Sequence, residues 1–410
     1  MNKMKLSNVC PHQALMLAIS ALALASLACS AIAHETPMPK LTKAPSVAES
    51  DPGGTTADDG APGEGVEVAV TSSPLPSPAP SPIPSPTPSP KPAPTTTPTP
   101  AQVPTTAPVV PMSESAISPA NVDRVTQLVL WDEGHGMPHQ LAWSPDGGTL
   151  ASASYNIYLY DTQALEPVGT IDAGGWTDSV AFSPDGSMLA SASHQSVTLW
   201  EMPSGGELGS FDGIKSASSV AFSPDGTVLA VAADMAVKLL DVASRRELRT
   251  LIGHRGMVNT VAFSPDGGTL ASGAGEIKLW DVSTGRELHT LDRHESWVHS
   301  VAFSPDGQLL ASGSVDQAVK LWEVSSGREL RTLSAHTGQV DGVAFSPDGQ
   351  LLASASWDLT VRLWEVQSGR ELRALTGHTN WLRTVAFSPD GETLASGAYD
   401  ATVRLWGLGE

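Results

Sequence analysis

The chain has 410 residues and a formal net charge of −20 at pH 7: residues 1–33 carry +2, residues 34–121 carry −5 and residues 122–410 carry the remaining −17. A surface of this sign repels phosphate groups, so nucleic acid and anionic lipid are poor candidate partners. Both cysteines, Cys10 and Cys29, precede residue 34, which excludes disulfides and cysteine metal sites from the rest of the chain.

Residues 1–33 have the pattern of an export signal. Two lysines form a positive start, a run of 15 almost wholly apolar residues extends from Ala14 to Ala28, and Ala31-Ile32-Ala33 supplies a small-x-small cleavage site. A lipoprotein signal is the second interpretation, because residues 26–29 (SLAC) resemble a lipobox and would make Cys29 the lipidation site. An uncleaved anchor is the third. Cleavage of either kind predicts a secreted, periplasmic or cell-surface protein whose only membrane contact would be a lipid on Cys29.

Residues 34–121 have the composition of an acidic, proline-rich and disordered linker. From Pro74 to Pro100, proline occupies almost every second position, with Ser, Thr or Ala between. Because proline has no N–H and a fixed φ, this run packs no core and should adopt extended polyproline II. At about 3.1 Å per residue it would span roughly 80 Å. The linker is either a spacer that holds the next domain away from a surface, with Ser and Thr open to O-glycosylation, or a plain solvated connection.

An internal repeat determines the fold expected for residues 122–410. Ser-Pro-Asp-Gly occurs seven times, and successive copies begin 39, 40, 41, 40, 42 and 42 residues apart. This period fits a four-stranded propeller blade and does not fit helical repeats of about 33 or 34 residues. We therefore predict an all-β domain, a seven-bladed β-propeller of four-stranded antiparallel blades. The copies begin at Ser144, Ser183, Ser223, Ser264, Ser304, Ser346 and Ser388.

Each copy contains four short β-rich segments. In the sixth copy they are residues 339–345, 351–356, 360–365 and 369–375, with turns at Pro347-Asp348-Gly349 and Trp357-Asp358-Leu359. No copy contains an apolar pattern of helical length.

The order of the motifs GH, VAFSPDG, LASGS, VKLW and GRELRTL resembles the WD-repeat family over residues 122–410. Members of that family close their rings by letting an N-terminal strand complete the last blade. Only four residues follow Trp406, so the seventh copy alone would have three strands and an open edge. Residues 123–130 (DRVTQLVL) are similar to the GRELRTL strand, and the resemblance implies that they supply the missing strand of a monomeric domain.

Three successive copies carry His, Ser, Asp and Trp at matching positions. Each His, Ser and Asp could be interpreted as a catalytic triad, but a hydrolase needs one asymmetric site, so the recurrence argues against catalysis. The family resemblance implies instead a buried hydrogen-bond tetrad that stiffens each blade. The fourth copy lacks the Asp and the first three keep the pattern only in part, so we expect the first half of the ring to be less rigid. The complete sets are His294, Ser312, Asp316 and Trp322; His336, Ser354, Asp358 and Trp364; and His378, Ser396, Asp400 and Trp406.

In this family the residues around the narrow opening come from the start of each first strand and from the position before the tetrad Asp. The first-strand positions here are Met137 and His139, Trp176 and Asp178, Ser216 and Ser218, Met257 and Asn259, Trp297 and His299, Gln339 and Asp341, and Trp381 and Arg383. The turn positions are Tyr155, Val315, Trp357 and Tyr399. Large aromatic residues that solve no packing problem are typical of interface anchors, although here they could simply plug the channel.

The resulting prediction is a non-catalytic, exported, bacterial-type scaffold that binds protein partners through an aromatic top face. The residues expected to bind are Trp176, Trp297, His299, Trp357, Trp381, Arg383 and Tyr399. The alternative is a cell-envelope propeller that binds a cell-wall glycan or a small ligand, or a propeller hydrolase. No cofactor or metal is expected, because the sequence has no HExxH motif, His-rich tract or paired-carboxylate cluster at ligand spacing.

Overall fold

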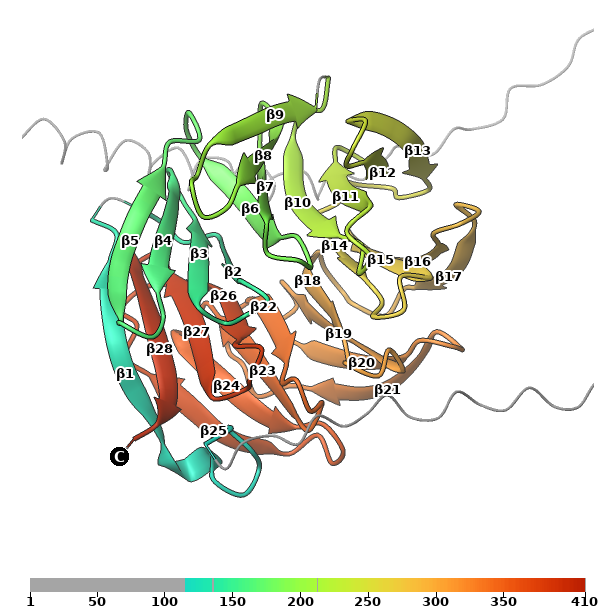
Figure 1. Cartoon of the computed structure of the whole chain (residues 1–410). Coiled ribbons are helices and arrows are strands. Elements are labelled where there is room, and N and C mark those ends of the chain that lie inside the picture. Colours follow the sequence, from blue (N-terminus) through green and yellow to red (C-terminus); the bar gives the residue numbers. More distant parts are fainter. Residues whose placement is uncertain (1–114, 135, 212, 410) are drawn as a thin grey trace, which may run out of the picture. The chain divides into compact units, whose positions relative to one another are not determined.

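The computed structural model describes residues 115–134, 136–211 and 213–409. These residues form a 3₁₀ helix, η1 (Val122–Arg124), and seven four-stranded antiparallel sheets arranged around a centre (Figure 1). The predicted seven-bladed β-propeller is therefore confirmed. The predicted export signal, Cys29 and the proline-rich run lie outside the described residues.

The first six blades each contain four strands that are consecutive in the chain. The strands of blades 1 to 3 are β2 (Gln140–Trp143), β3 (Thr149–Ala153), β4 (Ile157–Asp161) and β5 (Glu166–Ile171); β6 (Thr177–Phe182), β7 (Met188–Ser193), β8 (Val197–Glu201) and β9 (Glu207–Phe211); and β10 (Ala217–Phe222), β11 (Val228–Ala233), β12 (Ala236–Asp241) and β13 (Arg246–Ile252). The strands of blades 4 to 6 are β14 (Thr260–Phe263), β15 (Thr269–Gly273), β16 (Ile277–Asp281) and β17 (Glu287–Leu291); β18 (Val298–Phe303), β19 (Leu309–Ser314), β20 (Val319–Glu323) and β21 (Arg328–Leu333); and β22 (Val340–Phe345), β23 (Leu351–Ser356), β24 (Thr360–Glu365) and β25 (Glu371–Thr376).

Blade 7 joins the two ends of the domain, because it consists of β26 (Leu382–Phe387), β27 (Thr393–Ala398), β28 (Thr402–Leu408) and, outermost, β1 (Val125–Asp132). β1 runs antiparallel to β28, with Val125 opposite Leu408 and Trp131 opposite Val403. The closing strand predicted from the sequence thus forms, two residues further along the chain than expected.

A β-bulge shows that β1 is equivalent to the outer strands of the other blades. The register between β1 and β28 shifts between Gln127 and Val129, which places Gln127 opposite Trp406. In blade 6 the register between β24 and β25 shifts at the same point and places Glu371 opposite Trp364. The bulge therefore belongs to the blade design and is reproduced by a strand that comes from the other end of the domain.

The chain just before η1 is packed against blade 7. The Ile117 N–H donates to the Gly391 carbonyl at 2.9 Å, and the Ile117 side chain is buried in one cluster with Val122 and Val125. The packed part of the chain therefore includes Ile117, which precedes the domain start expected at residue 122.

The apolar core lies between neighbouring blades. One cluster, for example, joins Val319 and Leu321 of blade 5 to Val340, Val343 and Trp364 of blade 6. The first strands contact one another in order around the ring, and β26 contacts β2 to complete it. The described part of the chain contains no α-helix with the length and hydrophobicity needed to cross a lipid bilayer.

Each Ser-Pro-Asp-Gly turn has a local physical reason. In blade 6 the Ser346 hydroxyl donates to Asp348 Oδ1 at 2.6 Å and accepts the Leu351 N–H at 2.9 Å, so it fastens both ends of the turn. Gly349 has a φ of +71°, a conformation that residues with a Cβ rarely adopt. A Cβ on Gly349 would also lie 3.5 Å from Pro305 of blade 5, which shows how closely adjacent turns pack.

Candidate functional site

The repeated His, Ser, Asp and Trp residues of blades 5 to 7 form chains of hydrogen bonds inside each blade. In blade 6, His336 Nδ1 lies 2.8 Å from Asp358 Oδ2 and His336 Nε2 lies 2.7 Å from Ser354 Oγ. The Trp364 indole N–H donates to the same hydroxyl at 2.8 Å. Ser354 is completely buried, so its hydroxyl does not face solvent.

The same geometry recurs in the neighbouring blades. His294 lies 2.7 Å from both Asp316 and Ser312, and His378 lies 3.0 Å from Asp400 and 2.8 Å from Ser396. The tryptophans donate to the serines at 2.8 Å, from Trp322 to Ser312 and from Trp406 to Ser396.

The carboxylates of these chains are ionised and tightly held. Burial opposes ionisation of Asp316, but hydrogen bonds from His294 and from the Glu295 N–H outweigh it and lower the pKa of Asp316 to about 2. Burial likewise opposes ionisation of Asp358, yet hydrogen bonds from His336 and Thr360 keep the pKa of Asp358 well below the usual range.

In blade 4, Glu276 lies near the place of the missing Asp but forms no hydrogen bond with His254 Nδ1, and the repeat pattern did not predict this residue. His254 Nε2 lies 2.6 Å from Ser272 Oγ, and Glu276 Oε1 lies 3.5 Å from His254 Nδ1. Glu276 precedes Trp280 by four positions rather than six, and its longer side chain reaches the histidine from the shorter turn. Burial lowers the pKa of His254 to about 4 despite the nearby carboxylate, so this histidine is neutral at pH 7.

Blade 1 contains a different buried group, centred on Glu133. Tyr160 stands at the repeat position of the tetrad Trp, and its hydroxyl donates to Glu133 Oε1 at 3.0 Å. The Glu133 N–H donates to the Ala401 carbonyl of blade 7, so this residue lies at the seam where the ring closes. Burial raises the pKa of Glu133 to about 7. The sequence offered no motif for this contact, because Glu133 follows the closing strand rather than belonging to a repeat.

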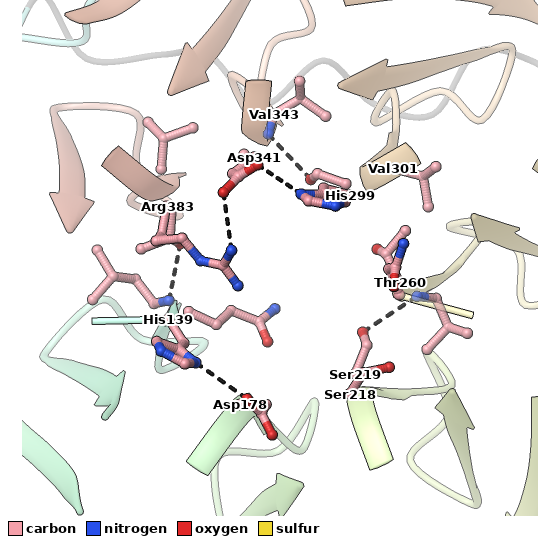
Figure 2. A pocket seen from close by; sticks show the side chains of 18 residues that line it. His139, Asp178, Ser218, Ser219, Thr260, His299, Val301, Asp341, Val343 and Arg383 are labelled. Atoms are coloured by element: carbon pink, nitrogen blue, oxygen red, sulfur yellow. Dashed lines mark hydrogen bonds and ion pairs between the residues drawn. The ribbon is translucent and has the colours of Figure 1, made fainter. Parts of the chain in front are cut away.

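A central opening lies at the end of the ring where the first strands begin (Figure 2). The opening has a volume of about 240 Å³, and every blade contributes one residue at or next to the start of its first strand. These residues are His139, Asp178, Ser218, Asn259, His299, Asp341 and Arg383. They belong to the first-strand positions that the family resemblance assigned to the top face.

Asp341 organises one side of this opening. Its carboxylate is almost completely buried and accepts hydrogen bonds from the Trp357 indole N–H at 2.7 Å and from Arg383 at 3.0 Å. His299 Nδ1 lies 2.7 Å away, and the Gln339 amide donates at 3.2 Å. Burial opposes ionisation, but the hydrogen bond with His299 and the charge of Arg383 lower the pKa of Asp341. The Arg383 guanidinium, held in this way, points into the opening (Figure 2).

Six rings from blades 1, 2, 7 and 6 form a continuous arc beside the opening. We call Tyr155, Trp176, His139, Tyr399, Trp381 and Trp357 the aromatic arc. The centroids of Tyr155 and Trp176 are 5.5 Å apart, and those of Trp176 and His139 are 5.8 Å apart. The next distances are 6.0 Å from His139 to Tyr399, 6.2 Å from Tyr399 to Trp381 and 4.0 Å from Trp381 to Trp357. The last pair is parallel, with an interplanar angle of 3°.

The residues predicted to bind a partner therefore differ in their surroundings. Trp176, Trp297 and Trp381 are 39%, 44% and 44% exposed and present their rings to solvent. Trp357 is partly buried behind Trp381 and is fixed by Asp341, so it supports the exposed ring. Trp297 packs beside Gly256 of the preceding segment and is not part of the arc.

Arg383 and Tyr399 form a contact of their own, with the guanidinium carbon 5.7 Å from the ring centroid. The aromatic arc spans the ring closure, with Trp357, Trp381 and Tyr399 on blades 6 and 7 and His139, Tyr155 and Trp176 on blades 1 and 2. Among the described residues, no group of three or more His, Cys, Asp or Glu side chains is placed to hold a metal ion.

A family model described as WD domain, G-beta repeat matches six segments that together cover more than half of the chain: residues 166–201, 205–241, 245–281, 285–323, 327–365 and 369–407. Each segment runs from the outer strand of one blade to the third strand of the next. The unit before them, β1 to β4, has the same strand arrangement but carries the Glu133 and Tyr160 pair. No curated protein sequence matches the chain.

Proposed function

The chain belongs to the WD40 family, whose propellers generally act as scaffolds that bind protein partners, and on this premise we propose that it is a non-catalytic interaction module that uses the aromatic arc and Trp297 as its binding surface. The observation that carries the proposal is the exposure of three tryptophans on one face, next to an opening lined by residues of all seven blades. Tryptophan and arginine are the residues that most often carry the energy of an interface.

The arrangement of charges and rings favours recognition over catalysis. The His and Ser side chains that could form a nucleophile and its base are buried within the blades, and each Ser hydroxyl already contacts the His and accepts a hydrogen bond from a tryptophan indole. Around the opening, Asp341 is engaged by four donors and serves to orient Arg383 and Trp357. Side chains fixed in this way form a preorganised surface, which lowers the entropic cost of binding.

The proposal includes a location outside the cytoplasm. Its support is the sequence of residues 1–33, with a positive start, an apolar run and a small-x-small cleavage site, followed by a proline-rich segment. The propeller would then be displayed in the periplasm, at the cell surface or in the medium.

The test compares single substitutions in the full-length mature protein. Trp381→Ala and Trp297→Ala should each lower the affinity for partners at least about 30-fold, because a true anchor contributes at least about 2 kcal/mol to the binding free energy. Capture of these partners from a cell-envelope extract should fall accordingly. Leu288→Ala is the control, since Leu288 is 46% exposed on the outer strand β17, away from the top face. Quantitative mass spectrometry of the captured proteins and a melting curve of each variant supply the readout.

Two results would contradict the proposal. Unchanged capture by both tryptophan variants, with lowered melting temperatures, would mean that the rings only plug the channel. If the wild type captured no protein but bound an array of cell-wall glycans, and the two tryptophan variants lost that binding, the face would bind glycans instead.

A further inference from the structure

The charges around the central opening do not balance. Asp178 and Asp341 carry two negative charges and Arg383 carries one positive charge, while the other residues from the first strands are neutral or histidine. Arg383 donates to Asp341 and compensates it. Asp178 forms no ion pair with a Lys or Arg among the described residues, although the charge of Arg383 acts on it from a longer distance. His139 Nδ1 lies 3.2 Å from Oδ1, and His194 lies 3.9 Å from Oδ2 without a hydrogen bond.

Two exposed rings are linked to this carboxylate through His139, which contacts Asp178 and stacks on Trp176. Trp176 precedes Asp178 by two positions on the same segment, and Tyr155 meets it edge to face at an interplanar angle of 89°. Trp176 and Tyr155 are 39% and 52% exposed, so part of each ring remains open to a ligand, although His139 stacks on Trp176. The negative face of an aromatic ring attracts cations, and a nearby carboxylate strengthens that attraction.

We infer that Tyr155, Trp176 and Asp178 form a site for a basic side chain, a lysine ammonium or an arginine guanidinium, presented by the protein partner. The inference rests on the proposed function and specifies the chemistry of the partner at blades 1 and 2. A cation here adds positive charge beside Asp178 and contacts the exposed part of Trp176. Arg383 forms its ion pair with Asp341 instead.

The net charge of the domain supports the same partner. Residues 122–410 carry −17, so the long-range field accelerates the approach of a basic segment and slows that of an acidic one. A neutral glycan would gain nothing from this field. The structure therefore favours a peptide segment that carries Lys or Arg.

The test uses capped pentapeptides, Gly-Gly-X-Gly-Gly, in which X is Arg, Lys, Gln or Glu, titrated into the full-length mature protein and followed by calorimetry and by the NMR signal of the Trp176 indole N–H. The Arg and Lys peptides should bind and shift this signal, and added salt should weaken them because the interaction is electrostatic. The Gln and Glu peptides should not bind.

Asp178→Asn should lower the affinity for the Arg peptide at least about fivefold, because it keeps the shape and removes the charge. Trp176→Leu, read by calorimetry, should lower it comparably. Asp292→Asn is the matched control: it removes the same charge from an exposed position between β17 and β18 and should leave the affinity unchanged. Melting curves establish that each variant is folded.

Equal binding of the Arg and Gln peptides, or an Arg-peptide affinity that Asp178→Asn leaves unchanged, would overturn the inference. If no peptide binds while protein capture still depends on Trp381, the inference fails and the proposed function stands. If the Arg peptide binds through Asp178 while capture is independent of Trp381, the cation site stands and the proposed use of the arc fails.

Discussion

Glu133 illustrates how a single buried side chain couples the ends of this ring. It follows the closing strand, hydrogen-bonds through its N–H to blade 7 and through its carboxyl to Tyr160 of blade 1. Its pKa is raised from 4.5 to about 7 by burial, so the folded protein retains a proton that the unfolded chain has lost. The contribution of Glu133 to the free energy of unfolding is fully present below pH 4.5 and is lost as the pH rises through 7.

We expect Glu133→Gln to remove that dependence. Between pH 5 and 8 the free energy of unfolding of the wild type should fall by up to about 3 kcal/mol relative to the variant, since each pH unit of the window contributes about 1.4 kcal/mol. Urea denaturation of both proteins at pH 5, 6, 7 and 8 measures the difference. Curves that stay parallel across this range would show that Glu133 is not a proton carrier.

At the tetrad of blade 6, Asp358→Asn should cost about 1.5 to 3 kcal/mol at pH 7, because the carboxylate accepts charge-assisted bonds from His336 and Thr360. Its pKa is lowered by folding, so this stability is present above the usual Asp range and lost as the pH falls through the folded value. Asp234→Asn is the control, since Asp234 occupies the corresponding turn of blade 3, is exposed and has a φ of 52° that Asn tolerates. Equal costs in urea denaturation would contradict the structural role of the tetrad.

Among the elements, β1 is the one whose loss would open the ring. Trp131 on this strand is buried, stacks on Tyr160 with centroids 4.3 Å apart and donates to the Leu165 carbonyl at 3.1 Å. Trp131→Ala should therefore destabilise the protein by about 3 to 5 kcal/mol. Leu128→Ala on the same strand should cost less than about 1 kcal/mol, because Leu128 is 41% exposed. Similar shifts in the thermal melts of the two variants would mean that β1 is not a closing strand.

The strands were predictable wherever local chemistry determines them. β23 and β24 have the bounds expected from alternation and from the turn at Trp357-Asp358-Leu359. β1 was predicted two residues early, because its ends are set by pairing with β28 rather than by turn residues of its own. Glu133 and Glu276 could not be assigned from the repeat pattern, since each reaches its partner from a position that the other blades do not use.

In the whole molecule, closure of the ring between blades 7 and 1 determines which side chains meet on the top face. The aromatic arc crosses from blade 7 to blade 1 through the contact of Tyr399 with His139, residues that lie at opposite ends of the domain sequence. The positions of these rings follow from the repeat, but their contact depends on how the seven blades close. The resulting surface is asymmetric, with the ion pair of Arg383 and Asp341 on blades 7 and 6 and Asp178 on blade 2.

We propose that this face, rather than the rim or the opposite face, binds the partner. The most direct test is photo-crosslinking with p-benzoylphenylalanine placed singly at Trp297, Trp381, Leu288 or Gln350 of the full chain, in cells that produce it. Leu288 lies on the outer strand β17, and Gln350 follows a Ser-Pro-Asp-Gly turn at the far end of the first strand. We expect partner adducts at the two tryptophan positions and none at Leu288 or Gln350. Adducts of the same proteins at Leu288 or Gln350, with none at Trp297 and Trp381, would contradict this proposal.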